Sequence, residues 1–340
     1  MKAVIYEGHN VLTYKDVDDV SPKYNEVKIK VRACGICGSD IHGYLGITGR
    51  RIPPVIMGHE FAGEILQLGE GVNDLKIGDR VAVYPLDFCG KCEMCKKRDM
   101  HLCLNKRAFG VLDVDGAFAE YICVPSKVCF KLNDNISYKV GSLMEPLAVS
   151  YRAVKHLGDL SGKDVLIIGA GTIGLLALAC AKMQNPNRIF VSDLSDYRLK
   201  IAKNMGADIV INSALNDLQE TIMTVTNNKG VESVAEAVGI TETVKQGIDA
   251  MAFGGTAVWI GISSKHIDLE MQQVVTRELK VKGSFLYGYD EFKEVVGYLN
   301  DGLLNVEPIL SQEIALRDLP ETMANLSVNH GNLIKVTVVN

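Results

Sequence analysis

Residues 165–181 read VLIIGAGTIGLLALACA and join an apolar run to three glycines. The central part, Gly169-Ala170-Gly171-Thr172-Ile173-Gly174, has the spacing G-x-G-x-x-G. Glycines at these positions permit a tight turn and a close approach of the backbone to a pyrophosphate, and a following helix supplies free N–H groups. The stretch is apolar enough to resemble a membrane span, but its glycines interrupt that pattern. We therefore predict a buried strand, a turn and a helix that begins near Thr172.

The pattern of apolar residues changes near residue 150. Before it, alternating runs such as 27–31 and apolar runs such as 81–84 indicate a β-rich region that Gly and Pro interrupt. After it, strand-like and helix-like segments alternate, which is typical of a parallel sheet covered on both faces. The stretch from about Phe285 returns to mixed structure and ends on the strand-like LIKVTVV. A chain of 340 residues with this change is expected to form two domains.

An acidic residue follows the glycine motif at the distance expected for a carboxylate that binds the ribose of a dinucleotide. Asp193 ends the next predicted strand, nineteen residues after Gly174. A carboxylate there accepts hydrogen bonds from ribose hydroxyls and repels a 2′-phosphate, so the nucleotide site is predicted to favour NAD over NADP. Arg198, in the helix that follows, is a further predicted contact of the cofactor and softens this preference. The alternative role of Asp193 is a helix N-cap.

Composition limits the classes of protein that fit. Apolar residues make up 47% of the chain and charged residues 23%, as in ordinary soluble globular proteins. A net charge of −5 without a long basic run argues against nucleic acid as a partner. Nine cysteines, mostly clustered, fit a reducing cytoplasm better than a disulfide framework. The sequence MKAVIYEGHN begins like a strand and lacks the pattern of a signal peptide, so we expect a cytoplasmic protein with no membrane partner.

Four cysteines lie close together in FCGKCEMCKKRDMHLC, residues 88–103. Their spacing, C-x2-C-x2-C-x7-C, can close a tetrahedral shell around Zn²⁺, which needs no further ligand once it has four thiolates. The sequence therefore predicts a structural zinc site, and neighbouring Lys91, Lys96, Lys97 and Arg98 are expected to offset its negative charge. The alternatives are reduced thiols, two disulfides or an iron–sulfur cluster. The predicted ligands are Cys89, Cys92, Cys95 and Cys103.

Three further segments carry residues suited to catalysis. Cys37 lies in CGICGSDIH, His59 in GHEFAG and Glu145 in MEPLAVS. A thiolate, an imidazole and a carboxylate brought together would leave the fourth position of a zinc ion open, which distinguishes a catalytic site from a structural one. Each residue alone also has an ordinary explanation: a small buried cysteine, a turn histidine and a carboxylate at a helix start.

Taken in order, GICGSDIH, GHEFAG, the cysteine quartet, MEPLAVS and GAGTIG resemble the motifs of the zinc-dependent medium-chain dehydrogenase/reductase family. The resemblance covers essentially the whole chain. It implies an α/β fold with a GroES-like β-rich catalytic domain, residues 1–150 completed by 286–340. It also implies an NAD-binding Rossmann domain with a doubly wound parallel sheet, residues 151–285, and an active site in the cleft between the domains.

The same resemblance implies roles for individual residues and two zinc ions per chain, one catalytic and one structural. Glu60 matches a carboxylate that lies beside the catalytic metal and can exchange onto it. Asp40 matches a residue that orients a histidine ligand. The other implied roles are Cys37, His59 and Glu145 as zinc ligands, and Ser39 and His42 as the proton relay.

Two details narrow the branch of the family. Glu145 stands where ethanol-type alcohol dehydrogenases usually carry Cys, and in this the chain resembles the sorbitol, polyol and polyol-phosphate dehydrogenases. Leu286 stands where sorbitol dehydrogenase-like sequences commonly carry a substrate-binding Arg, so sorbitol itself is not the expected substrate. Arg50 and Arg51 are candidate contacts of a substrate phosphate. Their alternative role is that of solvated loop charges.

The predicted function is hydride transfer between a secondary alcohol of a polyol or polyol phosphate and NAD. Amino-alcohol (threonine-type) and vicinal-diol dehydrogenases are alternatives, as are an NAD-binding sensor and a zinc-free quinone or enone reductase. The resemblance implies a homodimer or homotetramer in which the strands of 255–262 and 279–285 pair edge to edge.

Overall fold

The apolar run at 165–168 lies in strand β11 (Asp164–Ile168), all of whose residues are buried. Helix α5 (Thr172–Lys182) follows after a turn in which Gly169 has φ +95°. A Cβ atom on Gly174 would overlap the carbonyl oxygen of Gly169, so this helix approaches the turn in a way that only glycine allows. The predicted strand, turn and helix are thus confirmed in the computed structural model of the chain, which describes residues 1–329 and 331–340.

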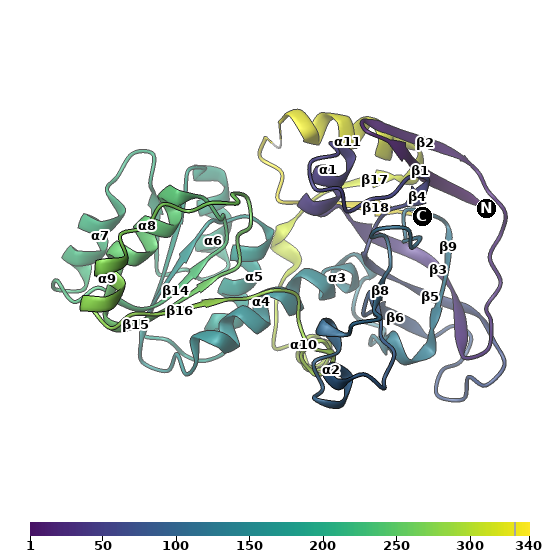
Figure 1. Cartoon of the computed structure of the whole chain (residues 1–340), viewed down its shortest axis with the longest axis horizontal. Helices are drawn as coiled ribbons and strands as arrows, with labels where there is room; N and C mark the ends of the chain where they lie inside the picture. The colour runs from purple at the N-terminus through teal and green to yellow at the C-terminus, as the bar shows by residue number, and fades with distance from the viewer. Residues whose placement is uncertain (330) are drawn as a thin grey trace. The chain divides into compact units, whose positions relative to one another are not determined.

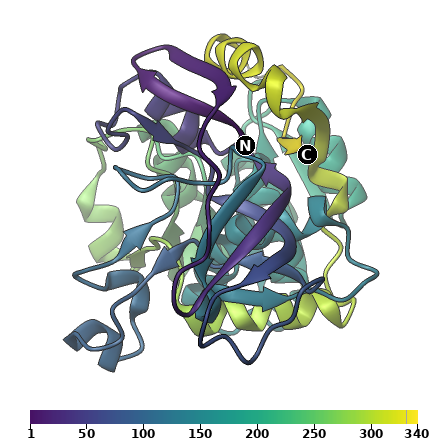
Figure 2. The ribbon, with the colours of Figure 1, turned by 90° about the vertical axis from the view of Figure 1, so that its right-hand side faces the viewer.

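The chain forms two compact units. Unit 1 comprises residues 1–145, 288–302 and 310–340, and unit 2 comprises residues 146–287 and 303–309. Both termini belong to unit 1, and the chain returns to this unit after completing most of unit 2 (Figures 1 and 2). Among the described residues, no helix is both long and apolar enough to cross a membrane.

Unit 2 is built on a six-stranded parallel sheet. The order of its strands is β13 (Ile209–Asn212), β12 (Arg188–Asp193), β11, β14 (Val231–Glu236), β15 (Met251–Trp259) and β16 (Lys280–Gly283). The order reverses at β11, because β12 and β14 lie on its opposite sides. In open α/β sheets, ligands bind at the carboxyl ends of the strands at such a point.

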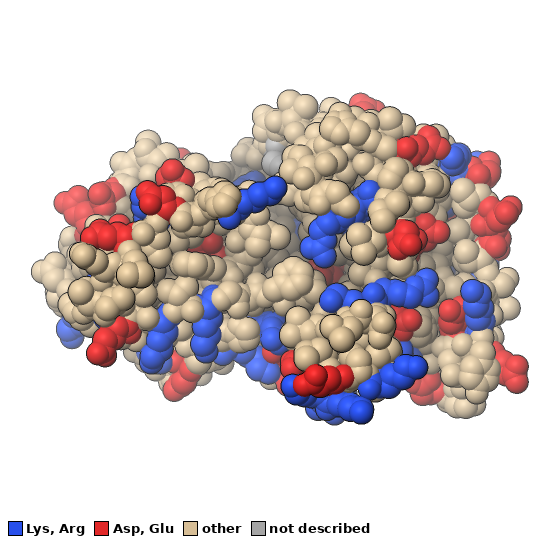
Figure 3. Space-filling view, viewed as in Figure 1, with Lys and Arg blue, Asp and Glu red and all other residues tan. Residues whose placement is uncertain are grey.

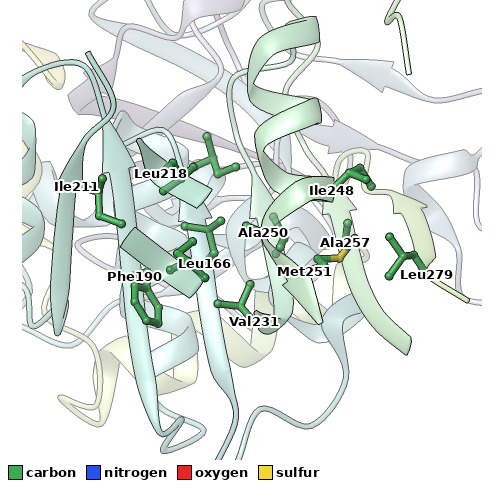
Figure 4. Packing of buried hydrophobic residues seen from close by; sticks show 13 residues of the cluster. Leu166, Phe190, Ile211, Leu218, Val231, Ile248, Ala250, Met251, Ala257 and Leu279 are labelled. Atoms are coloured by element: carbon green, nitrogen blue, oxygen red, sulfur yellow. The ribbon is translucent and has the colours of Figure 1, made fainter. Parts of the chain in front are cut away.

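The helices of unit 2 connect these strands. They are the greater part of α4 (Met144–Leu157), α5, α6 (Asp196–Asn204), α7 (Leu218–Val225), α8 (Thr241–Ala250), α9 (Met271–Thr276) and the short η3 (Glu307–Ile309). One core cluster packs Leu166 and Phe190 of the sheet with Leu218 of α7 and Ile248 of α8 (Figure 4). Continuously apolar strands are the expected pattern for a parallel sheet that is buried on both faces.

Unit 1 is built on a larger, mainly antiparallel sheet around strand β3 (Glu26–Gly35), whose residues alternate between half-buried and buried positions as far as Ala33. The strand order is β10 (Cys129–Lys131), β6 (Arg80–Val83), β5 (Glu60–Leu68), β3, β18 (Lys335–Val339) and β17 (Leu310–Ala315), and β9 (Tyr121–Pro125) also pairs with β3. The C-terminal strand β18 lies antiparallel to β3, with Thr337 opposite Gly35. The end of the chain therefore completes the sheet that its beginning forms.

Smaller elements complete unit 1. Two further sheets contain β2 (Val11–Asp16), β1 (Lys2–Gly8) and β4 (Val55–Ile56), and β7 (Leu86–Asp87) with β8 (Arg107–Ala108). The helices are α1 (Gly38–Tyr44), α2 (Glu93–Lys96), α3 (Tyr138–Ser142), α10 (Tyr289–Asn300) and α11 (Leu319–Val328), with the short helices η1 (Met100–Leu102), η2 (Ser126–Val128) and η4 (Leu316–Asp318).

Candidate active site and metal centres

Cys37 lies at the junction between strand β3 and helix α1, where it is the N-cap residue. Its Sγ atom accepts a hydrogen bond from the backbone N–H of Ser39, 3.4 Å away. Its own N–H donates to Oδ2 of Asp40 at 3.1 Å, so the two residues form a reciprocal capping box. Local sequence therefore fixes both the backbone and the thiol of Cys37.

The structure brings Cys37, His59 and Glu60 together. One ligand atom from each of the three lies within 4.8 Å of the other two. A thiolate, an imidazole and a carboxylate are ligands that zinc accepts, and three protein ligands leave the fourth position of a tetrahedral ion open. The chemistry of this donor set fits a catalytic metal. Glu145 does not belong to this set of close ligand atoms, although the sequence analysis placed it among the ligands.

Glu60 has a partner that the sequence analysis missed. Nζ of Lys335 donates to Glu60 Oε2 at 2.6 Å and to the carbonyl oxygen of Ile36 at 3.0 Å, and the side chains of Lys335 and Glu60 are 3% and 1% exposed. Burial lowers the pKa of Lys335, but Glu60, Cys37 and Glu145 outweigh it and raise that pKa. Glu145, which is itself buried, therefore lies close enough to act on the same lysine. The sequence feature that could have indicated this contact is Lys335 itself, a charged residue inside the strand-like run LIKVTVV.

Asp40 stands behind the ligands and is fully buried. Its Oδ1 atom lies 3.4 Å from Nδ1 of His59 and accepts a hydrogen bond from Nη2 of Arg51 at 2.9 Å. Burial raises the pKa of Asp40, but His59 and Arg51 outweigh it and hold that pKa well below its usual range. Arg51 is thus paired inside the protein and is not a solvated loop charge, whereas Arg50 is exposed.

Ser39 and His42 both lie on helix α1 and are exposed to solvent. Ser39 follows Cys37 by two residues, and its hydroxyl oxygen lies 3.5 Å from Nη2 of Arg51. A hydroxyl beside a metal ligand, with an imidazole on the same helix, is an arrangement that can pass a proton toward water.

The sulfur atoms of the cysteine quartet surround a single point. The Sγ–Sγ distances are 3.6 Å for Cys92–Cys95 and Cys103–Cys89, 3.8 Å for Cys92–Cys103 and 3.9 Å for Cys89–Cys95. Four sulfurs placed tetrahedrally at the usual Zn–S distance of about 2.3 Å stand about 3.8 Å apart. A disulfide would require an S–S distance of about 2.0 Å. The geometry fits one tetrahedral ion and argues against two disulfides.

Two of the positively charged side chains near the quartet pair with carboxylates and not with the thiols. Lys97 pairs with Glu93, and Arg98 pairs with Asp290 of α10, so these two do not offset the thiolate charge as the sequence analysis expected. Figure 3 shows acidic and basic side chains together over α2. Backbone N–H groups take this role instead: those of Lys91 and Cys92 lower the pKa of Cys89 to about 6, whereas burial raises the pKa of Cys95 to about 12. A bound cation would favour the thiolate form of Cys89 and Cys95 alike, because metal ligands must be deprotonated.

The nucleotide-binding motif lies at the carboxyl end of β11. Gly171 is the N-cap of α5, and an added Cβ atom there would meet no other atom within 4 Å, so the space beside the turn is open. Oδ2 of Asp193 accepts a hydrogen bond from the N–H of Ala170 at 2.7 Å, and Oδ1 accepts one from Ser195 at 2.9 Å. The N-cap of α6 is Ser195, which accepts a hydrogen bond from the N–H of Arg198. Asp193 is therefore not the N-cap and braces the glycine turn.

Comparison with known proteins agrees with this architecture. A model of the alcohol dehydrogenase GroES-like domain matches residues 23–134, and a model of the zinc-binding dehydrogenases matches residues 172–301. The chain is 36% identical to L-threonine 3-dehydrogenase of Thermococcus kodakarensis, over 88% of this chain and 86% of that protein. It is 33% identical to sorbitol dehydrogenase of Bacillus subtilis, over 99% of this chain and 97% of that protein.

Among solved structures, galactitol-1-phosphate dehydrogenase of Escherichia coli matches with a TM-score of 0.92 and 27% identity, and the match covers 100% of both chains. The predicted fold class, a GroES-like β-rich domain with a Rossmann domain, is confirmed. The chain belongs to the zinc-dependent medium-chain alcohol dehydrogenases and is an oxidoreductase that acts on CH–OH groups.

Proposed function

We propose that the chain transfers a hydride between a secondary alcohol of a polyol or polyol phosphate and NAD, which yields a ketose or ketose phosphate. The observation that carries this proposal is the set of Cys37, His59 and Glu60, whose ligand atoms lie within 4.8 Å of one another at the start of helix α1. The activities named for the relatives from Bacillus subtilis and Escherichia coli support a polyol or its phosphate as the substrate class.

Each residue of the site has a distinct task in this chemistry. Cys37, His59 and either Glu60 or Glu145 would hold the zinc ion, which supplies Lewis acidity that lowers the pKa of a bound alcohol. The hydroxyl of Ser39 would accept a proton from the alcohol while it passes its own proton on toward the exposed imidazole of His42, which releases a proton to water. Asp40 keeps the ring of His59 in place.

The second task is to bind the hydride acceptor. The open turn at Gly169–Gly174 and the N-terminus of α5 would hold the pyrophosphate of NAD. Thr172 and Ile173 supply the first N–H groups of this helix. Asp193 would accept the adenosine ribose hydroxyls and disfavour a 2′-phosphate, with Arg198 in the first turn of α6 beside it.

A threonine-type amino alcohol is the second candidate substrate. The relative from Thermococcus kodakarensis is named for that activity. The pairing of Arg51 with Asp40 also removes one of the two arginines that the sequence offered to a substrate phosphate. Both candidates use the same metal site and the same cofactor and differ only in the groups around the carbinol carbon.

The direct test is NADH formation by the zinc-loaded protein with matched substrates. Short sugar alcohols would be offered free and as terminal phosphates beside L-threonine and a vicinal diol, and each assay would be repeated with NADP. Turnover with a polyol or its phosphate and NAD supports the proposal. Turnover with L-threonine alone selects the second candidate, and NAD binding without turnover of any substrate favours an NAD-binding sensor.

Replacing Ser39 with alanine is expected to lower kcat by about 10²- to 10⁴-fold, because a positioned proton acceptor typically contributes this much. Steady-state rates and zinc content of the purified variant check the prediction. The matched control is Ser21→Ala, which removes an exposed hydroxyl of the same unit outside the site. A Ser39→Ala variant that turns over at the wild-type rate contradicts a role in proton transfer.

The edge of the parallel sheet supports self-association. Strand β16 is the last strand of that sheet and pairs only with β15 among the described strands. Phe253, which lies in β15, and Ile262, three residues after that strand, are about four-fifths exposed. An open edge strand flanked by apolar side chains favours pairing with a second chain, as in a homodimer or homotetramer. A solution mass equal to one chain would contradict this part of the proposal.

A further inference from the structure

Arg51 is an arginine that the protein buries. The whole residue is 6% exposed and its side chain only 3%. Its guanidinium group donates to Asp40 Oδ1 at 2.9 Å and to the carbonyl oxygen of Arg50 at 3.1 Å, and its Nη2 atom also lies 3.5 Å from the hydroxyl oxygen of Ser39. Taking two opposite charges out of water costs several kcal/mol per ion, so a buried pair is weak evidence for stability. The position of the pair suggests another role.

Both oxygens of Asp40 contact residues of the metal site. Oδ2 accepts the N–H of Cys37 at 3.1 Å, and Oδ1 lies 3.4 Å from Nδ1 of His59. Arg51 binds the same Oδ1 atom and thereby limits the positions that the carboxylate can take. The side chain of Arg51 therefore fixes Asp40, and Asp40 in turn fixes two of the three proposed metal ligands.

Helix α1 leaves space at Gly43 for the side chain of Arg51. Gly43 is the second-last residue of the helix, where glycine is a poorer helix former than alanine. A Cβ atom on Gly43 would stand 2.6 Å from Cγ of Arg51, too close for both to fit. The glycine thus leaves room for the arginine side chain that reaches Asp40.

Each buried basic side chain beside the ligands has its own carboxylate partner: Lys335 pairs with Glu60, and Arg51 pairs with Asp40. Without Arg51 the carboxylate of Asp40 would be left buried beside only an imidazole and an amide, a state that costs several kcal/mol.

We propose that Arg51 is a positioning residue of the catalytic metal site, which acts through Asp40 on His59 and Cys37 and makes no contact with substrate. This inference rests on the proposed function, because it presupposes that Cys37 and His59 hold zinc. It also removes Arg51 from the groups that select a phosphorylated substrate.

The test is the rate at which the zinc-loaded enzyme releases its two zinc ions to an excess of chelator. In Arg51→Met, one zinc equivalent is expected to leave about 10- to 100-fold faster, which is the usual effect of losing a residue behind a metal ligand. The other equivalent, held by the four cysteines, should leave at the wild-type rate and serves as an internal control. Arg50→Met is the matched control, because Arg50 is the exposed neighbour, and it should release both ions as the wild type does.

The outcomes separate this inference from the proposed function. Unchanged release from Arg51→Met, or equal acceleration of both ions, overturns the role of Arg51. A wild-type protein that binds only one zinc ion overturns the proposed catalytic metal itself. If Arg51→Met does not fold, Gly43→Ala replaces it, since the new Cβ displaces the arginine while alanine favours the helix. Faster release of one ion from Gly43→Ala supports the inference, and release at the wild-type rate overturns it.

A second readout excludes contact with substrate. Arg51→Met is expected to lower kcat to the same extent for a free polyol and for its phosphate, because the defect lies in the metal site. A rise of KM confined to the phosphorylated substrate, with zinc release unchanged, overturns the proposal and returns Arg51 to the phosphate contacts.

Discussion

Alcohol oxidation by the Cys37→Ala variant is expected to fall by at least about 1,000-fold, since a metal ion contributes several kcal/mol to such a reaction and each 1.4 kcal/mol is tenfold in rate. Cys37 is the only thiol in the catalytic set, and its replacement leaves an imidazole and a carboxylate that already has a lysine partner. Two such ligands do not hold zinc in a defined geometry. The measurements are NADH formation and zinc content of the purified variant.

The zinc content shows whether the variant loses activity because it loses the catalytic metal. We expect one zinc equivalent to remain, bound at the quartet, and NADH binding by unit 2 to persist. Cys123→Ala is the matched control, because Cys123 is a half-buried thiol of the same unit outside both clusters and its loss should leave activity and zinc unchanged. Full turnover by Cys37→Ala with the metal depleted would show that the proposed mechanism is wrong.

Local sequence predicted those parts of the site that depend on neighbours in the chain. The glycine turn, the strand before it and the helix after it need only about twenty residues, and all three were predicted. The quartet is also local, because its four cysteines span residues 89–103. The alternative role of Asp193, that of a helix N-cap, is wrong, since Ser195 caps α6.

Contacts between distant segments could not be predicted in this way. Glu60 and Lys335 are 275 residues apart in sequence and meet because β18 pairs with β3 beside β5. Arg51 was predicted to be a phosphate contact or a solvated loop charge, because nothing near it in sequence shows that Gly43 leaves space for its side chain. Each of these contacts joins a charge to a buried partner, so the sequence shows the charge but not what it pairs with.

The Cys95→Ser variant is expected to lose the structural zinc and the fold of the lobe formed by residues 88–104. Cys95 and Cys103 are 6% and 1% exposed, and the lobe has only the short helices α2 and η1. Structural zinc contributes apparent free energies of about 10–16 kcal/mol in small peptides, which is as large as the whole stability of many domains, about 5–15 kcal/mol. The lobe has no comparable apolar core to replace that contribution.

Limited proteolysis measures this loss locally. Lys91, Lys96, Lys97 and Arg98 lie within the lobe, so trypsin should cut Cys95→Ser there first and divide the chain at this point, whereas the zinc-loaded wild type resists. Wild-type protein stripped of zinc should be cut in the same way, and Cys129→Ser, which removes a thiol outside the quartet, should not.

Contacts between the lobe and helix α10 determine how much structure the Cys95→Ser variant keeps. Phe88 packs edge to face against Tyr289 with ring centroids 5.4 Å apart, and Arg98 pairs with Asp290 on the same helix, α10. Phe88 and Tyr289 are half-buried, and the Arg98–Asp290 pair is exposed. An aromatic pair contributes about 0.5–1.5 kcal/mol and an exposed ion pair about 0–1 kcal/mol, so the two contacts together are much weaker than a structural zinc site. Unit 2 has its own core cluster and should still bind NADH. A Cys95→Ser protein that keeps two zinc ions and resists trypsin would show that three thiolates suffice and that the lobe is stabilised mainly by α10.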